Sequence, residues 1–307
     1  MNITSLRGLA AKAAESPHPP MLAAACPYDA PTLAALARAV REGVIRAVLY
    51  GDSERVRAGF ETVGEQPPDD VEIICASTPD DALAAAVKAV RDGGADIIMK
   101  GLVDTSDFLR AVLSRAGGLR GAGEYGDALL SAFGIFETPR YHKLFAVTDF
   151  AMNIAPDLDA KRSILENAAG FLRALGVAEP KIAVLSETEH INPKIQASID
   201  AAELKRMNQS GEISGCVVEG PIAFDLAMSR EAAEIKGCDS PVAGDADLIL
   251  VPDIISGNAL VKSLTLFGGA QTAGAVIGAA VPIVMTSRSA TPDDKYYSIC
   301  LSALGLR

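Results

Sequence analysis

The sequence predicts an α/β protein of two domains in which parallel strands are joined by crossover helices. Short apolar runs alternate with amphipathic helical segments along most of the chain, as in a parallel sheet. At 307 residues, the chain is also longer than one hydrophobic core usually supports. The alternation changes near residue 148. We therefore expect one domain from residues 1–148, completed by 287–307, and a second from residues 149–286.

Composition and charge narrow the class of protein. Hydrophobic residues make up 49% of the chain and charged residues 22%, as in an ordinary globular protein. The net charge of −11 argues against binding to a nucleic-acid backbone, which requires a basic surface. A small anionic ligand remains possible, because a few arginines can dominate the charge of a cleft.

No segment predicts export or insertion into a membrane. The longest apolar stretch, residues 272–285, is interrupted by Gly274, Gly278 and Pro282. The N-terminus lacks the charged and apolar regions of a signal peptide. The five cysteines are widely spaced without a C-x-x-C pair, which indicates buried thiols in a reducing compartment. We expect a cytoplasmic protein, and the three histidines show no spacing that predicts a metal site.

The expected elements form two β/α series separated by a hairpin. In the first series, strands are expected at residues 21–26, 45–50, 71–75 and 95–99, and helices at 1–17, 31–42, from Gly51, at 80–91 and after Thr105. The runs 128–137 and 143–148 predict an antiparallel hairpin. In the second series, strands are expected at 181–185, 216–218, 247–251 and 281–285, and helices at 158–175, 193–208, 259–267, 271–280 and from Pro292.

The strand at residues 281–285 predicts a binding site for an anion. It is followed by Ser287 and Arg288, just before the N-terminus of the final helix, where backbone N–H groups and the helix dipole favour negative charge. An arginine can also bind a phosphate through two hydrogen bonds. Alternatively, Ser and Asp side chains only cap this helix and Arg288 is solvated.

A second polar segment, Lys100 to Arg110, also follows an expected strand. Ligands of open parallel sheets bind at the carboxyl ends of the strands. Taken alone, Arg110 is better explained as a plain surface arginine.

Several separate stretches of the sequence resemble the phosphate acetyl/butyryl transferase family. The similarity runs from about residue 20 to the C-terminus, and the motifs occur in the order that the family has. The first two stretches and Ser263–Gly274 are most similar to the butyryl branch. The stretches are Lys100–Leu113, Thr148–Asp157, Gly220–Asp225, Val251–Asn258, Ser263–Gly274 and Thr286–Arg288.

The resemblance implies a fold, a reaction and partners. The fold would be a two-domain parallel-sheet sandwich like that of the isocitrate and isopropylmalate dehydrogenases, with the active-site cleft between the domains. The reaction would be reversible transfer of a short acyl group between coenzyme A and phosphate, with butyryl or a similar group favoured and acetyl as the alternative. Coenzyme A would be a substrate, no cofactor would be bound permanently, and the protein would be a homodimer or higher homo-oligomer.

The same resemblance implies roles for single residues. Ser287 and Arg288 match the pair at the family's acyl-phosphate site, and Arg110 matches an arginine that contacts phosphate. The acetyl branch has a catalytic aspartate at the position of Asp294, whereas the butyryl branch has its carboxylate at Asp293. We favour Asp294 as the base. Substrate-binding roles are expected for Arg110, Thr105, Ser106, Asn258 and Asp293.

The residue types suit this chemistry. The thiol of coenzyme A has a pKa of about 8.5, so a carboxylate or solvent must accept its proton as it attacks. Ser287 and Arg288 can stabilise the negative charge that forms on the carbonyl oxygen during this attack. Phosphate is a good leaving group, so the reaction requires no metal.

Two other classes of protein fit the sequence less well. A nicotinamide-dependent dehydrogenase on the same fold is disfavoured, because the first strand–helix turn, Ala24–Pro31, has no G-x-G-x-x-G. A non-catalytic paralogue that binds coenzyme A or acyl phosphate is expected to have lost Ser287, Arg288 or Arg110, and all three are present.

Overall fold

The protein is described by a computed structural model that covers residues 3–114, 117–119, 129–287 and 289–306. Its contacts divide the chain into two compact units. We call Leu6–Ala128 with Ala273–Arg307 the terminal unit, and Met1–Ser5 with Leu129–Thr272 the central unit. Strands and helices alternate in both units, so the expected α/β class with two domains is confirmed.

The terminal unit is built on a sheet with the strand order β3-β2-β1-β4-β11-β10. Neighbouring strands are parallel except β10 and β11, which are antiparallel. The strands are β1 Met21–Ala25, β2 Arg46–Gly51, β3 Val71–Cys75, β4 Ile97–Lys100, β10 Gln271–Ile277 and β11 Ile283–Val284. The helices are α1 Leu6–Ala14, α2 Ala30–Arg41, α3 Ser53–Thr62, α4 Pro79–Arg91, α5 Thr105–Val112 and α11 Pro292–Leu304.

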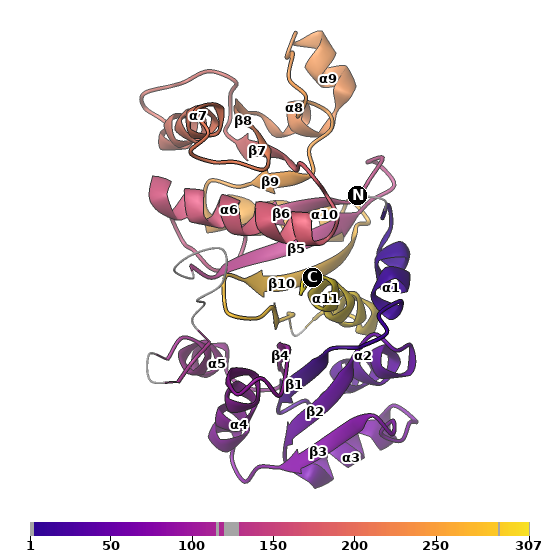
Figure 1. Ribbon diagram of the computed structural model, residues 1–307. Coiled ribbons are helices and arrows are strands. Elements are labelled where there is room, and N and C mark those ends of the chain that lie inside the picture. Colours follow the sequence, from indigo (N-terminus) through magenta and orange to yellow (C-terminus); the bar gives the residue numbers. More distant parts are fainter. Residues whose placement is uncertain (1–2, 115–116, 120–128, 288, 307) are drawn as a thin grey trace. The chain divides into compact units, whose positions relative to one another are not determined.

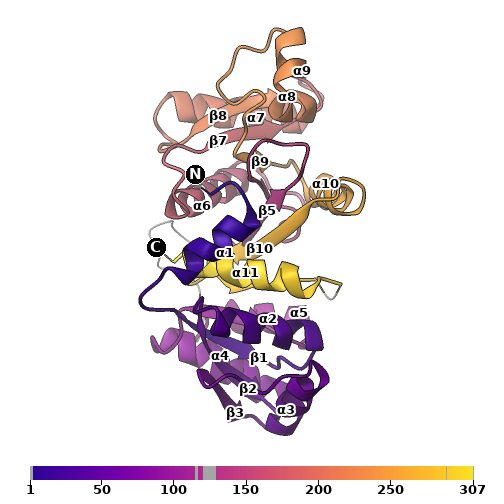
Figure 2. The same cartoon turned by 90° about the vertical axis from the view of Figure 1, so that its right-hand side faces the viewer.

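Helices cover both faces of this sheet. Helix α2 and helix α4 lie on opposite sides of β1 and β2 (Figures 1 and 2). Helix α11 packs against α1 and α2, and every residue from Lys295 to Leu304 is buried. From β1 the chain moves outward through β2 to β3, and it then returns through α4 to β4 on the other side of β1.

The central unit has the strand order β5-β6-β9-β7-β8. Strands β6, β9, β7 and β8 are parallel, and β5 is antiparallel to β6, which confirms the predicted hairpin. The strands are β5 Ser131–Glu137, β6 Phe145–Thr148, β7 Lys181–Leu185, β8 Val217–Ile222 and β9 Leu248–Leu250. The helices are α6 Leu158–Ala174, α7 Gln196–Gln209, α8 Phe224–Met228, α9 Arg230–Ile235 and α10 Ile254–Leu266.

The hairpin explains where the two units begin and end. Strand β6 pairs with β9 of the central sheet, and Phe136 and Phe145 stack with their ring centroids 5.7 Å apart in the central core. Residues from Leu129 onward therefore belong to the central unit, whereas the sequence placed the change of domain after residue 148. The chain returns to the terminal unit at Ala273, ahead of the expected residue 287.

The predicted helix at residues 271–280 is wrong. Residues Gln271–Ile277 form strand β10, which pairs antiparallel with β11 through Val276 and Ile283. The segment contains the β-branched residues Thr272, Val276 and Ile277, which favour a strand. Gly278 ends it with a φ of 95°. Hydrophobic periodicity alone did not distinguish a helix from a strand here, and the pairing with β11 determines that the segment is a strand.

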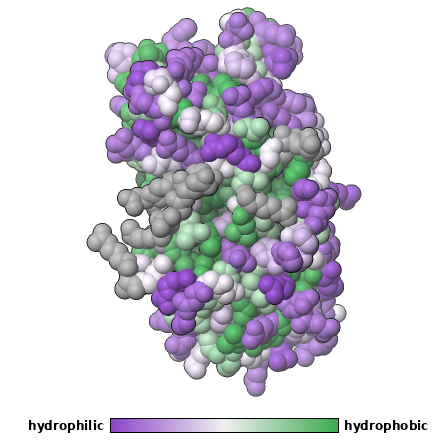
Figure 3. Space-filling view, viewed as in Figure 1, coloured by the Kyte–Doolittle hydropathy of each residue, from purple (hydrophilic) through white to green (hydrophobic). Residues whose placement is uncertain are grey.

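None of the helices in the described ranges is both long and apolar enough to cross a bilayer. On the face in Figure 3, the surface over α7 and α9 is mainly hydrophilic.

Candidate functional site

The carboxyl ends of three neighbouring strands meet at one edge of the terminal sheet. Strands β1, β4 and β11 run in parallel, with Ala25 opposite Lys100 and Met99 opposite Val284. The segments that follow them therefore start at the same edge. The chain also reverses its direction across the sheet between β1 and β4, and such a switch point is where open α/β sheets bind ligands.

Ser287 lies in the exposed turn that follows β11. Its Oγ lies 2.7 Å from Ser289 Oγ and accepts a hydrogen bond from the Ser289 backbone N–H at 3.1 Å. The Ala290 N–H donates to the Ser287 carbonyl at 3.1 Å, which closes the turn. Arg288, expected to bind phosphate, lies outside the described residues.

Asp294 closes the N-terminal turn of α11. Its backbone N–H donates to Thr291 Oγ1 at 3.1 Å, and its Oδ2 accepts the Thr291 backbone N–H at 2.9 Å. The Thr291 hydroxyl also lies 2.8 Å from Oδ2. This reciprocal arrangement is a capping box, which fixes the orientation of the carboxylate.

Asp293, one residue earlier, has a different partner. Its Oδ1 accepts a hydrogen bond from Arg38 Nη1 of α2 at 2.9 Å, although 67% of its side chain is exposed. The Arg38 guanidinium carbon lies 3.7 Å above the ring of Tyr296, and Arg38 Nε donates to Glu42 Oε1 at 2.9 Å. The Tyr296 hydroxyl in turn donates to Glu42. Asp293 is thus part of a contact that joins α11 to α2.

Helix α5 begins directly after β4, at the same edge of the terminal sheet. Thr105 and Ser106 are its first two residues, and both are exposed. Asp104 occupies the N-cap position without a side-chain capping hydrogen bond. Arg110 lies one turn further on and forms an ion pair with Asp107 at 2.7 Å, with 75% of the arginine side chain exposed. Such exposed pairs stabilise weakly, so Arg110 can exchange Asp107 for a bound anion at little cost.

Lys295 is a polar residue of this edge that the sequence did not single out. It is buried, and its Nζ donates to Thr286 Oγ1 at 3.0 Å. Lys295 directly precedes Tyr296–Leu304, a helical segment that is buried throughout. This position is the sequence feature that could have identified it. A lysine in such a segment is rarely there for packing alone.

The central unit brings together polar groups at the carboxyl edge of its own sheet. After β6, the buried carboxylate of Asp149 accepts backbone hydrogen bonds from Ala132, Ala151, Met152 and Asn153 at 2.9–3.1 Å. A cavity of about 1030 Å³ at this edge is lined by residues that include Asp157, Lys161, Asp200 and Asp253. Asp149 therefore organises the loop that resembled the family, and its oxygens are occupied by backbone donors.

Asn258 lies in α10 of the central unit, where its side chain is exposed. Asp253 caps this helix by accepting the Ser256 N–H at 2.9 Å. The Val251–Asn258 motif thus forms the short loop after β9 and the first turn of α10. Among the described residues, no cluster of three or more His, Cys, Asp or Glu side chains could hold a metal ion.

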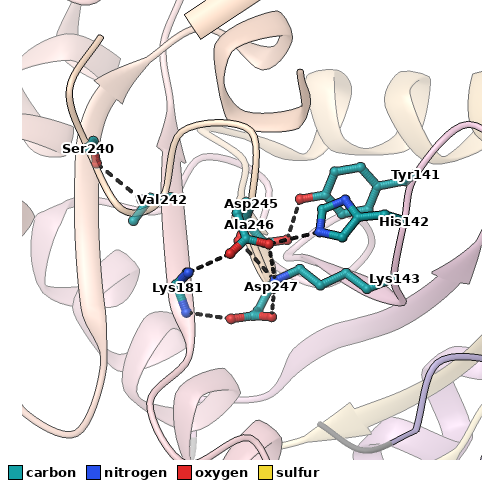
Figure 4. A network of polar contacts seen from close by, with 9 residues as sticks. All are labelled: Tyr141, His142, Lys143, Lys181, Ser240, Val242, Asp245, Ala246 and Asp247. Carbon is teal, nitrogen blue, oxygen red and sulfur yellow. Dashed lines mark hydrogen bonds and ion pairs between the residues drawn. The ribbon is translucent and has the colours of Figure 1, made fainter. Parts of the chain in front are cut away.

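A charged network at the opposite, amino edge of the central sheet is structural. Lys143 Nζ contacts Asp247 Oδ1 at 2.6 Å and Asp245 Oδ1 at 3.0 Å, and the latter also lies 2.9 Å from His142 Nε2 (Figure 4). Burial opposes the ionisation of Asp245, but hydrogen bonds from Lys181, Lys143 and His142 lower its pKa overall. This network joins the hairpin loop to the starts of β6, β7 and β9.

Comparisons with known proteins agree on one family. A family model described as phosphate acetyl/butaryl transferase matches residues 70–303. The chain is 43% identical over 280 residues to a probable phosphate butyryltransferase of Bacillus subtilis, covering 87% of this chain and 91% of the relative. It is 36% identical over 283 residues to the phosphate acetyltransferase of Thermotoga maritima, covering 92% and 94%. The crystal structure of a branched-chain phosphotransacylase from Enterococcus faecalis matches with a TM-score of 0.80 at 31% identity, covering 93% of this chain and 98% of the other.

Proposed function

Because this chain belongs to the phosphate acetyl/butyryl transferase family and is therefore a transferase enzyme, we propose that it transfers a short acyl group reversibly between coenzyme A and phosphate. In this reaction, acyl-CoA and phosphate form acyl phosphate and free coenzyme A. Coenzyme A acts as a substrate and is released in each cycle.

The observation that best supports this proposal is the placement of Ser287. Its hydroxyl is exposed in the turn between β11 and α11, at the edge where β1 and β4 also end. The N-terminus of α5, with Thr105 and Ser106, belongs to the same edge and favours an anion. A tetrahedral phosphate matches these donors.

We assign the reacting roles as follows. Arg288 and Arg110 bind the phosphate group, and Ser287 donates its hydroxyl to the carbonyl oxygen as negative charge develops there. Asp294 accepts the thiol proton of coenzyme A, the resulting thiolate attacks the acyl carbon, and the bond to phosphate breaks. The capping box supports this role, because it holds the carboxylate of Asp294 in one orientation through Oδ2 alone. We also assign a substrate-binding role to the exposed amide of Asn258 in α10.

The acyl group that we favour is butyryl or a similar short or branched chain. This choice rests on the 43% identity to a probable phosphate butyryltransferase and on the fold match to a branched-chain phosphotransacylase. Acetyl is the alternative, since a phosphate acetyltransferase is 36% identical over nearly the whole chain. One methylene group discriminates between substrates by only about 1–3 kcal/mol, so the choice depends on the shape of the acyl pocket.

We further propose that the enzyme is a cytoplasmic homodimer. Helix α10 supports the dimer: it is rich in aliphatic residues, yet Gly257 is its one buried residue. Ile255 is 78% exposed, and Leu266 and Phe267 at its end are 72% and 89% exposed. An apolar helix that is left uncovered in this way is typical of a surface that binds a partner.

An assay of thiol release tests the reaction. Purified protein is supplied with phosphate and acetyl-, propionyl-, butyryl- or isobutyryl-CoA, and both free thiol and acyl phosphate are measured. We expect release that depends on phosphate, with kcat/KM highest for butyryl or isobutyryl. Preference for acetyl-CoA would establish the alternative, and absence of turnover with all four substrates would favour a non-catalytic paralogue.

A further inference from the structure

Lys295 is a buried cation next to the turn that carries Ser287. Only 5% of its surface is exposed. Its ammonium donates to Thr286 Oγ1 at 3.0 Å and lies 3.9 Å from Asp29 Oδ1. Because Thr286 directly precedes Ser287, Lys295 contacts the chain segment to which we assign phosphate binding.

The positive charge of Lys295 is incompletely paired. An ammonium has three N–H donors, and among the described residues the Thr286 hydroxyl is its one acceptor within hydrogen-bonding distance. The nearby carboxylates are engaged elsewhere: Asp29 accepts the Thr32 N–H and hydroxyl at the start of α2, and Asp294 caps α11. Burial lowers the pKa of Lys295, and Asp29 and Asp294 only partly oppose this effect. A charge in this position is costly for the fold.

A second helix in the same unit shows that this type of helix start does not itself need a lysine. Helices α4 and α11 both begin with Thr-Pro-Asp-Asp, and in both the threonine is the N-cap. The residue that follows in α4 is Ala82, which is fully buried. The Thr-Pro-Asp-Asp start is therefore compatible with a small apolar residue at the next position, and it does not explain the lysine of α11.

The other buried lysine of comparable exposure, in the central unit, is paired in the usual way. Lys161 is also 5% exposed, and its Nζ contacts Asp200 Oδ2 at 2.6 Å. Lys295 has a hydroxyl at hydrogen-bonding distance where Lys161 has a carboxylate. The comparison indicates that part of the charge of Lys295 remains available to an anion.

We propose that Lys295 is a positioning residue of the phosphate site, which holds Ser287 in place through Thr286. This inference rests on the proposed function. The ligand concerned is a phosphate group, either inorganic phosphate or the phosphoryl end of an acyl phosphate. Because phosphate is negative, the uncompensated charge of Lys295 also favours its binding.

Substitution Lys295→Met tests this role, because methionine keeps the apolar stem without the charge. We expect the KM for phosphate to rise about tenfold or more, as for loss of a charge-assisted contact, while the KM for acyl-CoA stays within about twofold. The melting temperature should stay equal or rise, because an incompletely paired buried charge has been removed. A lysine with a purely structural role would instead lower the melting temperature and affect both substrates alike.

Changes at Thr286 provide the second, milder test. Thr286→Val removes the acceptor at nearly constant shape and should raise the phosphate KM about threefold or more, whereas Thr286→Ser should restore it. If Lys295 acts through Thr286, the double variant Lys295→Met/Thr286→Val should be no worse than Lys295→Met alone. Independent, multiplicative effects would overturn the proposed route.

Phosphate binding is also measured without turnover, by the shift in melting temperature that inorganic phosphate causes. Wild-type protein should be stabilised by phosphate, and Lys295→Met should be stabilised less. If wild type turns over no substrate but still shows this difference, the proposed reaction is wrong while Lys295 remains assigned. If wild type is active and Lys295→Met matches it in phosphate KM and phosphate stabilisation, the assignment of Lys295 is wrong.

Discussion

Asp293 and Asp294 stabilise the start of α11 in two different ways. Asp294 caps its own helix through Thr291, whereas Asp293 pairs with Arg38 of another helix. Both contacts have a structural value whether or not catalysis uses the carboxylate. Helix α4 makes the same point, since its Asp81 N–H bonds to Thr78 Oγ1 at 3.1 Å, the same length as the matching bond in α11. Kinetics must therefore separate the two roles.

We predict that Asp294→Asn lowers kcat about 100-fold or more with little change in KM, as expected for loss of a general base. The asparagine oxygen can still accept the Thr291 N–H, so the free energy of unfolding should fall by less than about 1 kcal/mol. Steady-state kinetics and urea denaturation measure the two quantities.

Two variants serve as controls for this substitution. Asp81→Asn makes the identical change in the matching turn of α4 and should leave turnover unchanged. Asp293→Asn weakens the contact to Arg38 and should keep turnover within about threefold, because exposed charges at helix ends contribute little. The reverse ranking of the two α11 variants would assign the base to Asp293, and mild effects in both would leave the thiol proton to solvent.

At the scale of elements, the start of α11 determines where Ser287 and Lys295 lie. Thr291→Ala removes the hydroxyl that accepts the Asp294 N–H, and it should lower the free energy of unfolding by about 1 kcal/mol. Thr78→Ala removes the same contact from α4 and should cost a similar amount. We expect only Thr291→Ala to raise the phosphate KM as well, measured on samples of equal folded fraction. Equal kinetics in both variants would show that this cap does not support the site.

Elements with a clear local signal were predictable, and those that depend on distant pairing were not. Strands Val71–Cys75 and Lys181–Leu185 have the expected bounds, because apolar runs there end in turn residues. The helix predicted at residues 271–280 was wrong, because hydrophobic periodicity does not reveal the pairing with β11. Ser287 could be proposed from its place before a helix N-terminus, but the burial of Lys295 and the partner of Asp293 depend on how α11 packs against α2.

At the scale of the whole molecule, each unit carries polar loops at the carboxyl edge of its sheet and has its own stabilising contacts. In the central unit, the network around Asp245 joins the hairpin loop to two further strands at the amino edge (Figure 4). Its residues come from parts of the chain that are 64 to 103 positions apart. Such long-range contacts are expected to govern stability more than turnover.

The acid stability of the central unit should therefore depend on Asp245. Its pKa is lowered in the folded protein, so its contribution to stability is fully present above the unfolded pKa of about 3.9 and is lost as the pH falls towards the folded value.

Asp245→Asn should lower the free energy of unfolding by about 2 kcal/mol at pH 7, the size of hydrogen bonds to a charged group. This difference from wild type should stay constant between pH 5 and 8 and shrink below about pH 4, because the unfolded wild-type chain then binds a proton at Asp245 that the folded chain does not. Urea denaturation across this range measures it, with the exposed Asp239→Asn of the same unit as control, which should change stability by less than about 0.5 kcal/mol. A difference that persists undiminished at pH 3 would mean that Asp245 stabilises the unit through packing and not through its charge.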